Sequence, residues 1–122
     1  MKILESAEMY LETILILKKR LGSVRSIDIA NELSYSKPSV SVAMKNLREN
    51  GYIYTDGDGC ITLSESGEAI ALSVYERHTI VSELLIRLGV SQETATEDAC
   101  RIEHVISEET FQKLKEYVDS QK

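Results

Sequence analysis

The sequence predicts a mainly α-helical fold with a small β-hairpin, in which a winged helix-turn-helix over residues 1–63 precedes a helical domain over 64–122. Apolar residues recur at helical spacing through most of the chain, which is typical of amphipathic helices. The exception lies mid-chain, where two β-prone runs, Tyr52–Thr55 and Cys60–Leu63, flank the turn sequence Asp56–Gly59. Helices followed by a hairpin are the element order of a winged helix-turn-helix.

The first two helices are predicted at 6–21 and 26–33. In the first, apolar side chains lie mostly at helical spacing, and Gly22 ends the helix. The second is short, and Ser26 is its expected N-cap because serine is among the preferred N-cap residues. The turn Ser34–Ser36 follows.

The third helix is predicted to begin at Lys37–Pro38. Ser36 is a good N-cap, and proline is tolerated in the first turn of a helix. Asn50–Gly51 is a typical helix end. The apolar residues that share one face of this helix are Val40, Met44 and Leu47.

The second half of the chain is predicted to hold three further helices. Ser64 is the expected N-cap of a long helix that runs to about Leu88 and ends at Gly89. Ser91 and Ser107 are expected to cap two more, since acidic residues follow each in the first turn, where the helix dipole favours negative charge. The long helix has enough apolar surface for a dimer interface, although the same side chains could be buried within one chain. They are Ile70, Val74, Val81, Leu84, Leu85 and Leu88.

The net charge of −6 argues at first against nucleic acid binding, but it is unevenly distributed. Residues 1–63 hold eight Lys or Arg and eight Asp or Glu, whereas 64–122 hold six and twelve, so the second half carries the whole excess. Within 18–49, seven basic and three acidic residues give a local charge of +4. DNA affinity depends on the face that meets phosphate, so this segment permits DNA binding. The acidic half either binds cations or is an ordinary solvated surface.

Nothing in the composition predicts a membrane protein. The chain has no apolar run of transmembrane length, and Met1–Glu5 lacks the apolar segment of a signal peptide. We therefore expect a cytoplasmic protein with no membrane partner. In that compartment Cys60 and Cys100 are expected to be free thiols or metal ligands rather than a disulfide.

The start of the third helix is the predicted DNA-reading element, because the second helix of such a pair can face base edges with its N-terminal residues. Small hydroxyl and apolar side chains there allow close approach to the groove, and nearby Lys and Arg suit phosphate. The candidate DNA-binding residues are Arg25, Ser36, Lys37, Pro38, Ser39, Ser41, Val42 and Lys45. The acidic turn between the β-prone runs is not expected to bind phosphate strongly. The alternative is a well-capped helical hairpin that only packs within the protein.

The segment Cys100–His104 places a thiol, a carboxylate and an imidazole at positions i, i+3 and i+4, which share one face if the segment is helical. A methionine and a glutamate three residues apart lie on the first predicted helix, and a histidine lies on the long one. This mixture of donors suits Fe(II), Co(II), Ni(II), Zn(II) or Mn(II) better than Mg or Ca ions. The candidate metal ligands are Met9, Glu12, His78, Cys100, Glu103 and His104. Each taken alone has an ordinary structural role as the alternative.

Two other classes of function compete with a metal-responsive DNA-binding protein. A metalloenzyme needs an open metal position, a pocket and a general base, and the sequence has no motif for them. Cys100 paired with His104 as a nucleophile lacks an evident third group to orient the pair. A winged-helix regulator that responds to thiol oxidation or to a small molecule, with a vestigial metal site, is the closer alternative.

Taken in order, these residues resemble the DtxR/MntR family of metal-dependent transcriptional repressors, which includes the diphtheria toxin repressor and the manganese transport regulator. The resemblance covers nearly the whole chain and is carried by Met9–Ile14, Ser36–Ser41, Leu63–Gly67, Arg77–His78 and Asp98–Ser107. It implies a homodimer in which a divalent metal joins the N-terminal helix to a metal-binding and dimerisation domain. Metal binding then activates binding to a double-stranded DNA operator, expected to be palindromic. A repressor of metal-uptake genes is the implied function.

The resemblance also implies two overlapping ligand sets. The iron-type set is Met9, Cys100, Glu103 and His104. The manganese-type set is Glu12, His78, Glu103 and His104. The mixture favours Fe(II), then Mn(II), with Co(II), Ni(II) or Zn(II) as surrogates. Ser82 and Thr96 stand at positions where the iron branch has ancillary ligands, and their presence argues against a second iron-type site. A carboxylate, Glu83, is adjacent to Ser82. The chain also stops at Lys122, which implies a short form without the SH3-like domain.

Overall fold

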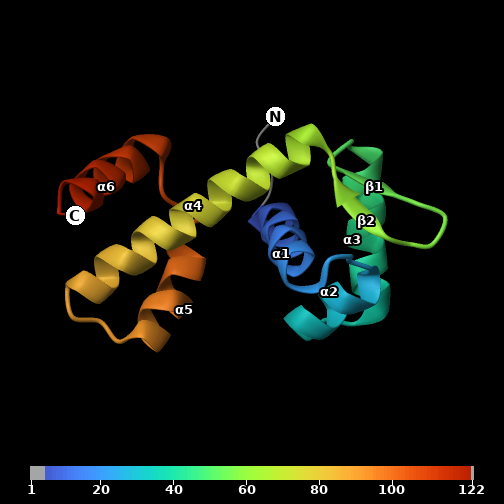
Figure 1. Ribbon diagram of the computed structural model, residues 1–122, viewed down its shortest axis with the longest axis horizontal. Helices are drawn as coiled ribbons and strands as arrows, with labels where there is room; N and C mark the ends of the chain where they lie inside the picture. The colour runs from blue at the N-terminus through green and yellow to red at the C-terminus, as the bar shows by residue number, and fades with distance from the viewer. Residues whose placement is uncertain (1–4, 122) are drawn as a thin grey trace. The chain divides into compact units, whose positions relative to one another are not determined.

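The computed structural model describes residues 5–121, which form six α-helices and one two-stranded antiparallel sheet (Figure 1). The mainly helical fold and the winged helix-turn-helix order are as the sequence predicts. After Leu72, within the longest helix, the chain divides into two compact units. No described helix has both the length and the apolar character needed to cross a membrane.

The first unit contains α1 (Glu5–Leu21), α2 (Ser26–Leu33), α3 (Lys37–Glu49) and the strands β1 (Ile53–Thr55) and β2 (Ile61–Leu63). Its core is formed by one face of each helix, including the face predicted for α3, and by the inward side chains of the strands. The buried residues of this core include Leu11, Ile14, Val24, Ile29, Val40, Met44, Leu47, Ile53 and Ile61. Burial of this face of α3 leaves its opposite face exposed to solvent.

Four serines cap helices as predicted. Ser36, Ser64, Ser91 and Ser107 each accept, on the side-chain oxygen, a hydrogen bond of 3.1–3.3 Å from the N–H three residues further on. The expected cap at Ser26 is wrong, because Ser26 is the first residue of α2 and Arg25 is the N-cap. Asp28 explains the shift, since its Oδ2 accepts a hydrogen bond of 2.9 Å from the Arg25 N–H.

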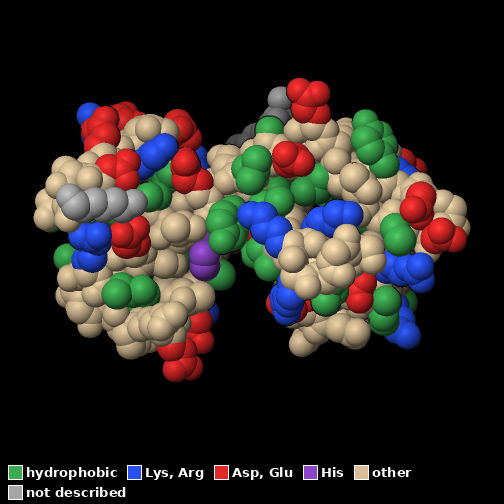
Figure 2. Space-filling view, viewed as in Figure 1, with side chains coloured by type: hydrophobic (Ala, Val, Ile, Leu, Met, Phe, Trp, Pro, Cys, Tyr) green, Lys and Arg blue, Asp and Glu red, His purple; other side chains and the backbone are tan. Residues whose placement is uncertain are grey.

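The hairpin closes on a turn held by an aspartate side chain. β1 and β2 pair antiparallel, with Thr55 opposite Ile61 next to the loop. Oδ1 of Asp56 accepts hydrogen bonds from the N–H groups of Asp58 and Cys60, each at 2.9 Å. The acidic tip of the hairpin, visible in Figure 2, is therefore a structural turn.

The beginning of α4 (Glu65–Arg87) is held tightly against the end of α3. The Ser64 N–H donates to the Tyr52 carbonyl at 2.9 Å, and the Ser64 hydroxyl donates to the Gly51 carbonyl at 2.7 Å. Gly67 lies so close that an added Cβ would overlap the Tyr52 carbonyl oxygen. The end of α3, the start of β1 and the start of α4 therefore meet at one hydrogen-bonded junction.

The second unit combines the rest of α4 with α5 (Gln92–Ile102) and α6 (Glu108–Ser120). Its core contains buried Ile80, Phe111 and Val118, with Leu84, Ile106 and Leu114 packed against them. α4 and α6 supply five of these six side chains. The sixth, Ile106, belongs to the turn between α5 and α6, which therefore packs against these two helices.

Most of the apolar side chains considered for a dimer interface pack within the single chain instead. Val74 and Val81 are buried, and Ile70 and Leu84 pack against the two cores. Leu88 is 69% exposed. The second unit has further exposed apolar residues, which are Tyr75, Ile86, Val105 and Tyr117.

Candidate metal centre and nucleic-acid interface

The thiol, carboxylate and imidazole of Cys100–His104 lie at the end of a helix rather than within one. α5 ends at Ile102, and His104 lies in the following turn. Glu103 keeps helical backbone angles, φ −59° and ψ −25°, and its N–H donates at 2.9 Å to the carbonyl four residues earlier. The i to i+3 relation between Cys100 and Glu103 is therefore preserved.

Four candidate ligands meet in the second unit. Nδ1 of His78, which projects from α4, lies at hydrogen-bond distance, 2.9 Å, from Oε2 of Glu103. The sulfur of Cys100 lies 3.8 Å from the same nitrogen. Nε2 of His104 lies 3.4 Å from the other carboxylate oxygen, Oε1 of Glu103. The Glu103 carboxylate is thus bracketed by two imidazoles.

The burial of Glu103 indicates what this cluster is suited to bind. The residue is 1% exposed, and among residues 5–121 its Oε1 accepts no hydrogen bond. Burying an ionised carboxylate is costly unless a compensating charge is near. The donor atoms of His78, Cys100 and Glu103 lie within 4.8 Å of one another. Zinc-type ions hold such donors at about 2.0–2.3 Å, so a separation of this size fits one shared ion.

The other two candidate ligands belong to the first unit. Met9 and Glu12 lie one turn apart on α1, and Glu12 is buried. The hydroxyl of Tyr35 donates a hydrogen bond to the Met9 sulfur at 3.8 Å. Tyr35 directly precedes Ser36, the N-cap of α3, so Met9 contacts the turn that leads into α3. Sequence reasoning missed Tyr35, because no local pattern links residues 26 positions apart.

The residues at the expected ancillary positions are engaged in other ways. The Thr96 hydroxyl donates to a carbonyl of its own helix at 2.9 Å, and Glu83 forms a 3.0 Å ion pair with Arg87. The hydroxyl of Ser82 is buried and has no hydrogen-bond partner within the described part of the chain. The incomplete second iron-type site stays a prediction.

The eight candidate DNA-binding residues are all exposed, and seven of them lie at or after the N-cap of α3. The Ser36 hydroxyl accepts from the Ser39 N–H and donates to the Ser39 hydroxyl, so its primary role is to cap the helix. Val42 is 60% exposed, although it is apolar. Lys37 and Ser41 line a shallow depression of about 210 Å³ that also touches α2. These features give α3 an exposed face of small and basic side chains.

Arg25 lies beside the hairpin loop. A hydrogen bond with the Cys60 side chain raises the pKa of Arg25, and Asp58 and Asp56 add to the effect. The guanidinium therefore stays charged while it faces acidic neighbours. Because these neighbours offset part of its charge, Arg25 is expected to contribute less to phosphate binding than Lys37 does.

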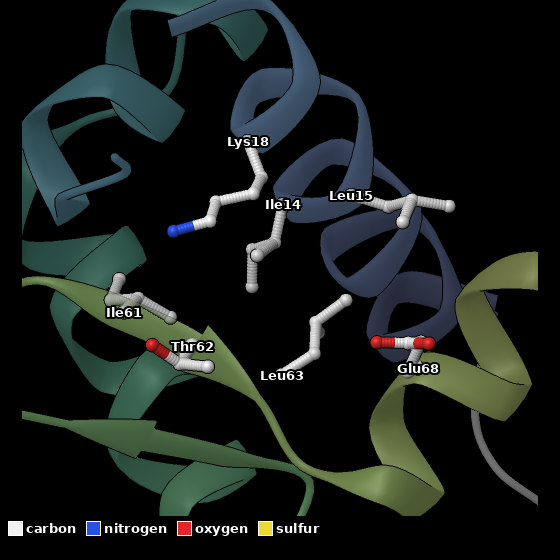
Figure 3. A pocket seen from close by; sticks show the side chains of 7 residues that line it. All are labelled: Ile14, Leu15, Lys18, Ile61, Thr62, Leu63 and Glu68. Carbon is white, nitrogen blue, oxygen red and sulfur yellow. The ribbon is translucent and has the colours of Figure 1, made fainter. Parts of the chain in front are cut away.

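A small cavity lies between α1, β2 and the start of α4 (Figure 3). Ile14 and Leu63 point into the space between helix and strand, with Lys18 and Glu68 at its margins. Its volume of about 100 Å³ is well below that of typical small-molecule sites, about 300–1,000 Å³. The cavity therefore gives no support to a regulator that responds to a small organic ligand.

In comparisons with known proteins, each half of the chain matches a described family domain. Residues 2–61 match the description "Iron dependent repressor, N-terminal DNA binding domain", and residues 64–122 match "Iron dependent repressor, metal binding and dimerisation domain". The winged helix-turn-helix and the ligand cluster thus occur in a protein class that joins DNA binding to metal binding. The chain belongs to the DtxR/MntR family of metal-dependent transcriptional regulators, whose members are DNA-binding proteins and not enzymes.

The similar proteins include both iron and manganese members of the family. The iron-dependent repressor IdeR of Mycobacterium tuberculosis is 32% identical over 114 residues, which are 93% of this chain and 50% of that protein. The transcriptional regulator MntR of Escherichia coli O157:H7 is 39% identical over 102 residues, 84% of this chain and 66% of that one. The structure of the manganese regulator SloR aligns with a TM-score of 0.82 at 26% identity, covering 93% of this chain and 53% of SloR. The chain spans only half to two thirds of these relatives.

Proposed function

We propose that this protein is a metal-dependent DNA-binding regulator that represses metal-uptake genes, with Fe(II) as the favoured metal and Mn(II) next. The observation that carries the proposal is the buried Glu103 carboxylate, which lies 2.9 Å from His78 and 3.4 Å from His104. The exposed thiol of Cys100 adjoins this group. Relatives that are iron-dependent repressors or manganese regulators support the same assignment.

The ligand set that we propose includes residues of both units. His78, Cys100, Glu103 and His104 form the part contributed by the second unit, and Met9 and Glu12 are proposed to complete it on the ground of family resemblance. A bound divalent ion supplies positive charge that offsets repulsion among the carboxylates. The thiolate of Cys100 and the thioether of Met9 are soft donors, which favours Fe(II) over Mn(II). Co(II), Ni(II) and Zn(II) are expected to act as surrogates.

The continuity of α4 offers a route from the ligands to DNA. The helix begins at the junction of Ser64 and Gly67 with the end of α3, and it carries His78 further along. We infer that fixing the ligands restrains the spacing of the two α3 helices in a homodimer. A palindromic operator requires that spacing to be about 34–36 Å, one turn of DNA. The exposed apolar residues of the second unit, such as Leu88 and Val105, are proposed to contribute to the dimer interface.

We assign the DNA-binding domain to 1–63 and the metal-binding and dimerisation domain to 64–122, with the protein in the cytoplasm. On α3, Ser39, Ser41 and Val42 are proposed to face base edges, while Lys37 and Lys45 bind phosphate with help from Arg25. Pro38 sets the first turn of the helix, and Ser36 caps it. This division of roles follows from the chemistry of each side chain.

Replacing Lys37 by alanine should weaken DNA binding to all sequences about equally. Loss of this one phosphate contact is expected to make the plot of log K for DNA binding against log salt concentration less steep by about 1. The measurement is fluorescence anisotropy on one duplex at several salt concentrations. Lys113→Ala is the matched control, because Lys113 is an exposed lysine on α6 of the second unit. A Lys37→Ala slope equal to the Lys113→Ala slope would remove Lys37 from the proposed contacts.

The proposed function is tested with DNA duplexes that the protein itself selects from random sequence in the presence of Mn(II). Anisotropy is then measured anaerobically at fixed salt with chelator, with Fe(II) and with Mn(II). Allosteric couplings of about 1–3 kcal/mol predict that metal tightens binding about 5- to 150-fold. His104→Ala should lose this gain. Equal affinity under all conditions would contradict the metal switch and leave DNA binding intact.

A regulator that responds to thiol oxidation is the second candidate function. Cys100 is exposed, and its sulfur lies 3.8 Å from Nδ1 of His78. If the site responds to metal, Cys100→Ala should lose most of the metal response, and peroxide should not change the DNA affinity of wild-type protein that is loaded with Mn(II). Cys60→Ala serves as the control, since Cys60 lies in the hairpin. A peroxide response that disappears in Cys100→Ala, with the metal response unchanged, would favour the oxidation-responsive alternative.

A further inference from the structure

The turn that carries Glu103 and His104 is held from the side by a single arginine. Arg77 immediately precedes His78 on α4, and its side chain is 16% exposed. Its Nη1 donates hydrogen bonds to the carbonyl of Glu103 at 3.3 Å and to the carbonyl of Ile106 at 2.9 Å. These two carbonyls flank His104, so one guanidinium spans the ligand-bearing turn.

The remaining contacts of the guanidinium fix its own position. Nη2 of Arg77 donates to Oε2 of Glu108, in the first turn of α6, at 2.9 Å. The guanidinium carbon also lies 5.3 Å from the centre of the Phe111 ring, within the range of a cation–π contact. A hydrogen bond from Gln112, and then Arg77, lowers the pKa of Glu108, which keeps this carboxylate ionised. Arg77 is thus anchored to α6 while it holds the turn.

Adjacent residues of α4 therefore hold Glu103 at two points. His78 binds the side-chain carboxylate at 2.9 Å, and Arg77 binds the main-chain carbonyl at 3.3 Å. A planar guanidinium can donate to several acceptors at fixed angles, whereas an ammonium is a single compact donor group. Lysine at this position would therefore reach one or two of the three acceptors.

We propose that Arg77 is a positioning residue that shapes the turn from Glu103 to Ile106 before metal binds, so that Glu103 and His104 are already placed as ligands. The proposal rests on the proposed function, because it assigns the metal site to these residues. Arg77 itself does not touch the ion. Outer-shell partners of metal ligands typically change metal affinity about 10- to 100-fold when they are replaced, and Arg77→Lys is expected to fall in this range.

The test compares Arg77→Lys with Arg87→Lys in the full chain. Arg87 is a matched control, because it lies on the same helix and also donates to a carbonyl, that of Gln121 at 3.2 Å, and to a carboxylate, that of Glu83 at 3.0 Å. Glu83 lies on α4 itself and Gln121 follows the end of α6, and neither residue is a candidate ligand. Co(II) is titrated anaerobically while its d–d and sulfur-to-metal absorption bands are recorded. Hydrogen exchange of the amides of residues 103–106 is measured without metal.

Arg77→Lys should weaken Co(II) binding, shift the absorption bands and accelerate exchange in residues 103–106, while Arg87→Lys leaves all three unchanged. Wild-type affinity, spectrum and exchange in Arg77→Lys would overturn the proposal, as would equal losses in both variants. If the Arg77→Lys variant does not fold, Glu108→Gln tests the same anchor and should give a smaller loss of the same kind. A wild-type protein that binds no Co(II) would refute the proposed function, and the exchange data without metal would still decide whether Arg77 holds the turn.

Discussion

Glu103→Gln is expected to abolish metal-induced stabilisation of the protein while leaving it folded. The carboxylate lies between the imidazoles of His78 and His104, and it is the most buried of the candidate ligands. The amide has the same shape, and its oxygen can still accept the hydrogen bond from His78. It carries no negative charge, however, and amides are much weaker ligands for transition metals than carboxylates. Removal of a buried charge also lowers the desolvation cost, so the protein without metal should not lose much stability.

The measurement for Glu103→Gln is chemical unfolding with and without Mn(II) or Co(II). At a metal concentration 100 times Kd, wild-type protein should gain about 2.7 kcal/mol in free energy of unfolding. The variant should gain almost nothing at the same concentration. Glu109→Gln is the control, because Glu109 is an exposed glutamate at the start of α6 and lies outside the ligand cluster. A variant that kept the wild-type gain would show that Glu103 is not a ligand.

Gly67→Ala should destabilise the first unit, although replacing glycine by alanine usually stabilises a helix. Alanine is ordinarily favoured over glycine in a helix interior by about 1 kcal/mol. Here the new Cβ would overlap the Tyr52 carbonyl oxygen. That carbonyl accepts a hydrogen bond of 2.9 Å from the Ser64 N–H, so it cannot move without breaking the junction. Overpacking of this kind typically costs about 1–3 kcal/mol, and a backbone obstacle places this case at the upper end.

The consequence for function should follow from the same junction. Because α4 meets the end of α3 and the start of β1 there, Gly67→Ala is expected to weaken DNA binding as well as to lower the melting temperature. Gly57→Ala is the control, since Gly57 lies in the hairpin loop with no atom within 4 Å of the added Cβ. Its effect should stay within about 0.5 kcal/mol. A Gly67→Ala protein more stable than wild type would contradict the packing described for this junction.

Local signals in the sequence predicted much of the fold. Four serine caps were predicted correctly, because each cap depends on residues within one turn of the helix it begins. The hairpin was predicted from turn residues between two β-prone runs. The cap of α2 was predicted wrongly, since Asp28 closes the turn on Arg25 and displaces Ser26 from that role.

The candidate site was less accessible to sequence reasoning because it depends on distant contacts. Spacing alone predicted that Cys100 and Glu103 share a face. It did not predict that Glu103 is the buried centre of the cluster or that α5 ends at Ile102. The contacts of Arg77 have no local signal in the sequence, because its acceptors lie 26 and 29 residues further along the chain. Such contacts arise from tertiary packing and leave no periodic pattern.

The central claim is that metal binding and DNA binding are coupled, and thermodynamic reciprocity tests it most directly. The affinity for a selected duplex is measured with and without Mn(II), and the affinity for Mn(II) is measured with and without the duplex, at one salt concentration. Linkage requires the two ratios to be equal. We expect a common factor of about 5 to 150 for wild-type protein and a factor near one for His104→Ala. Ratios of one for wild-type protein, with both ligands bound, would contradict the account.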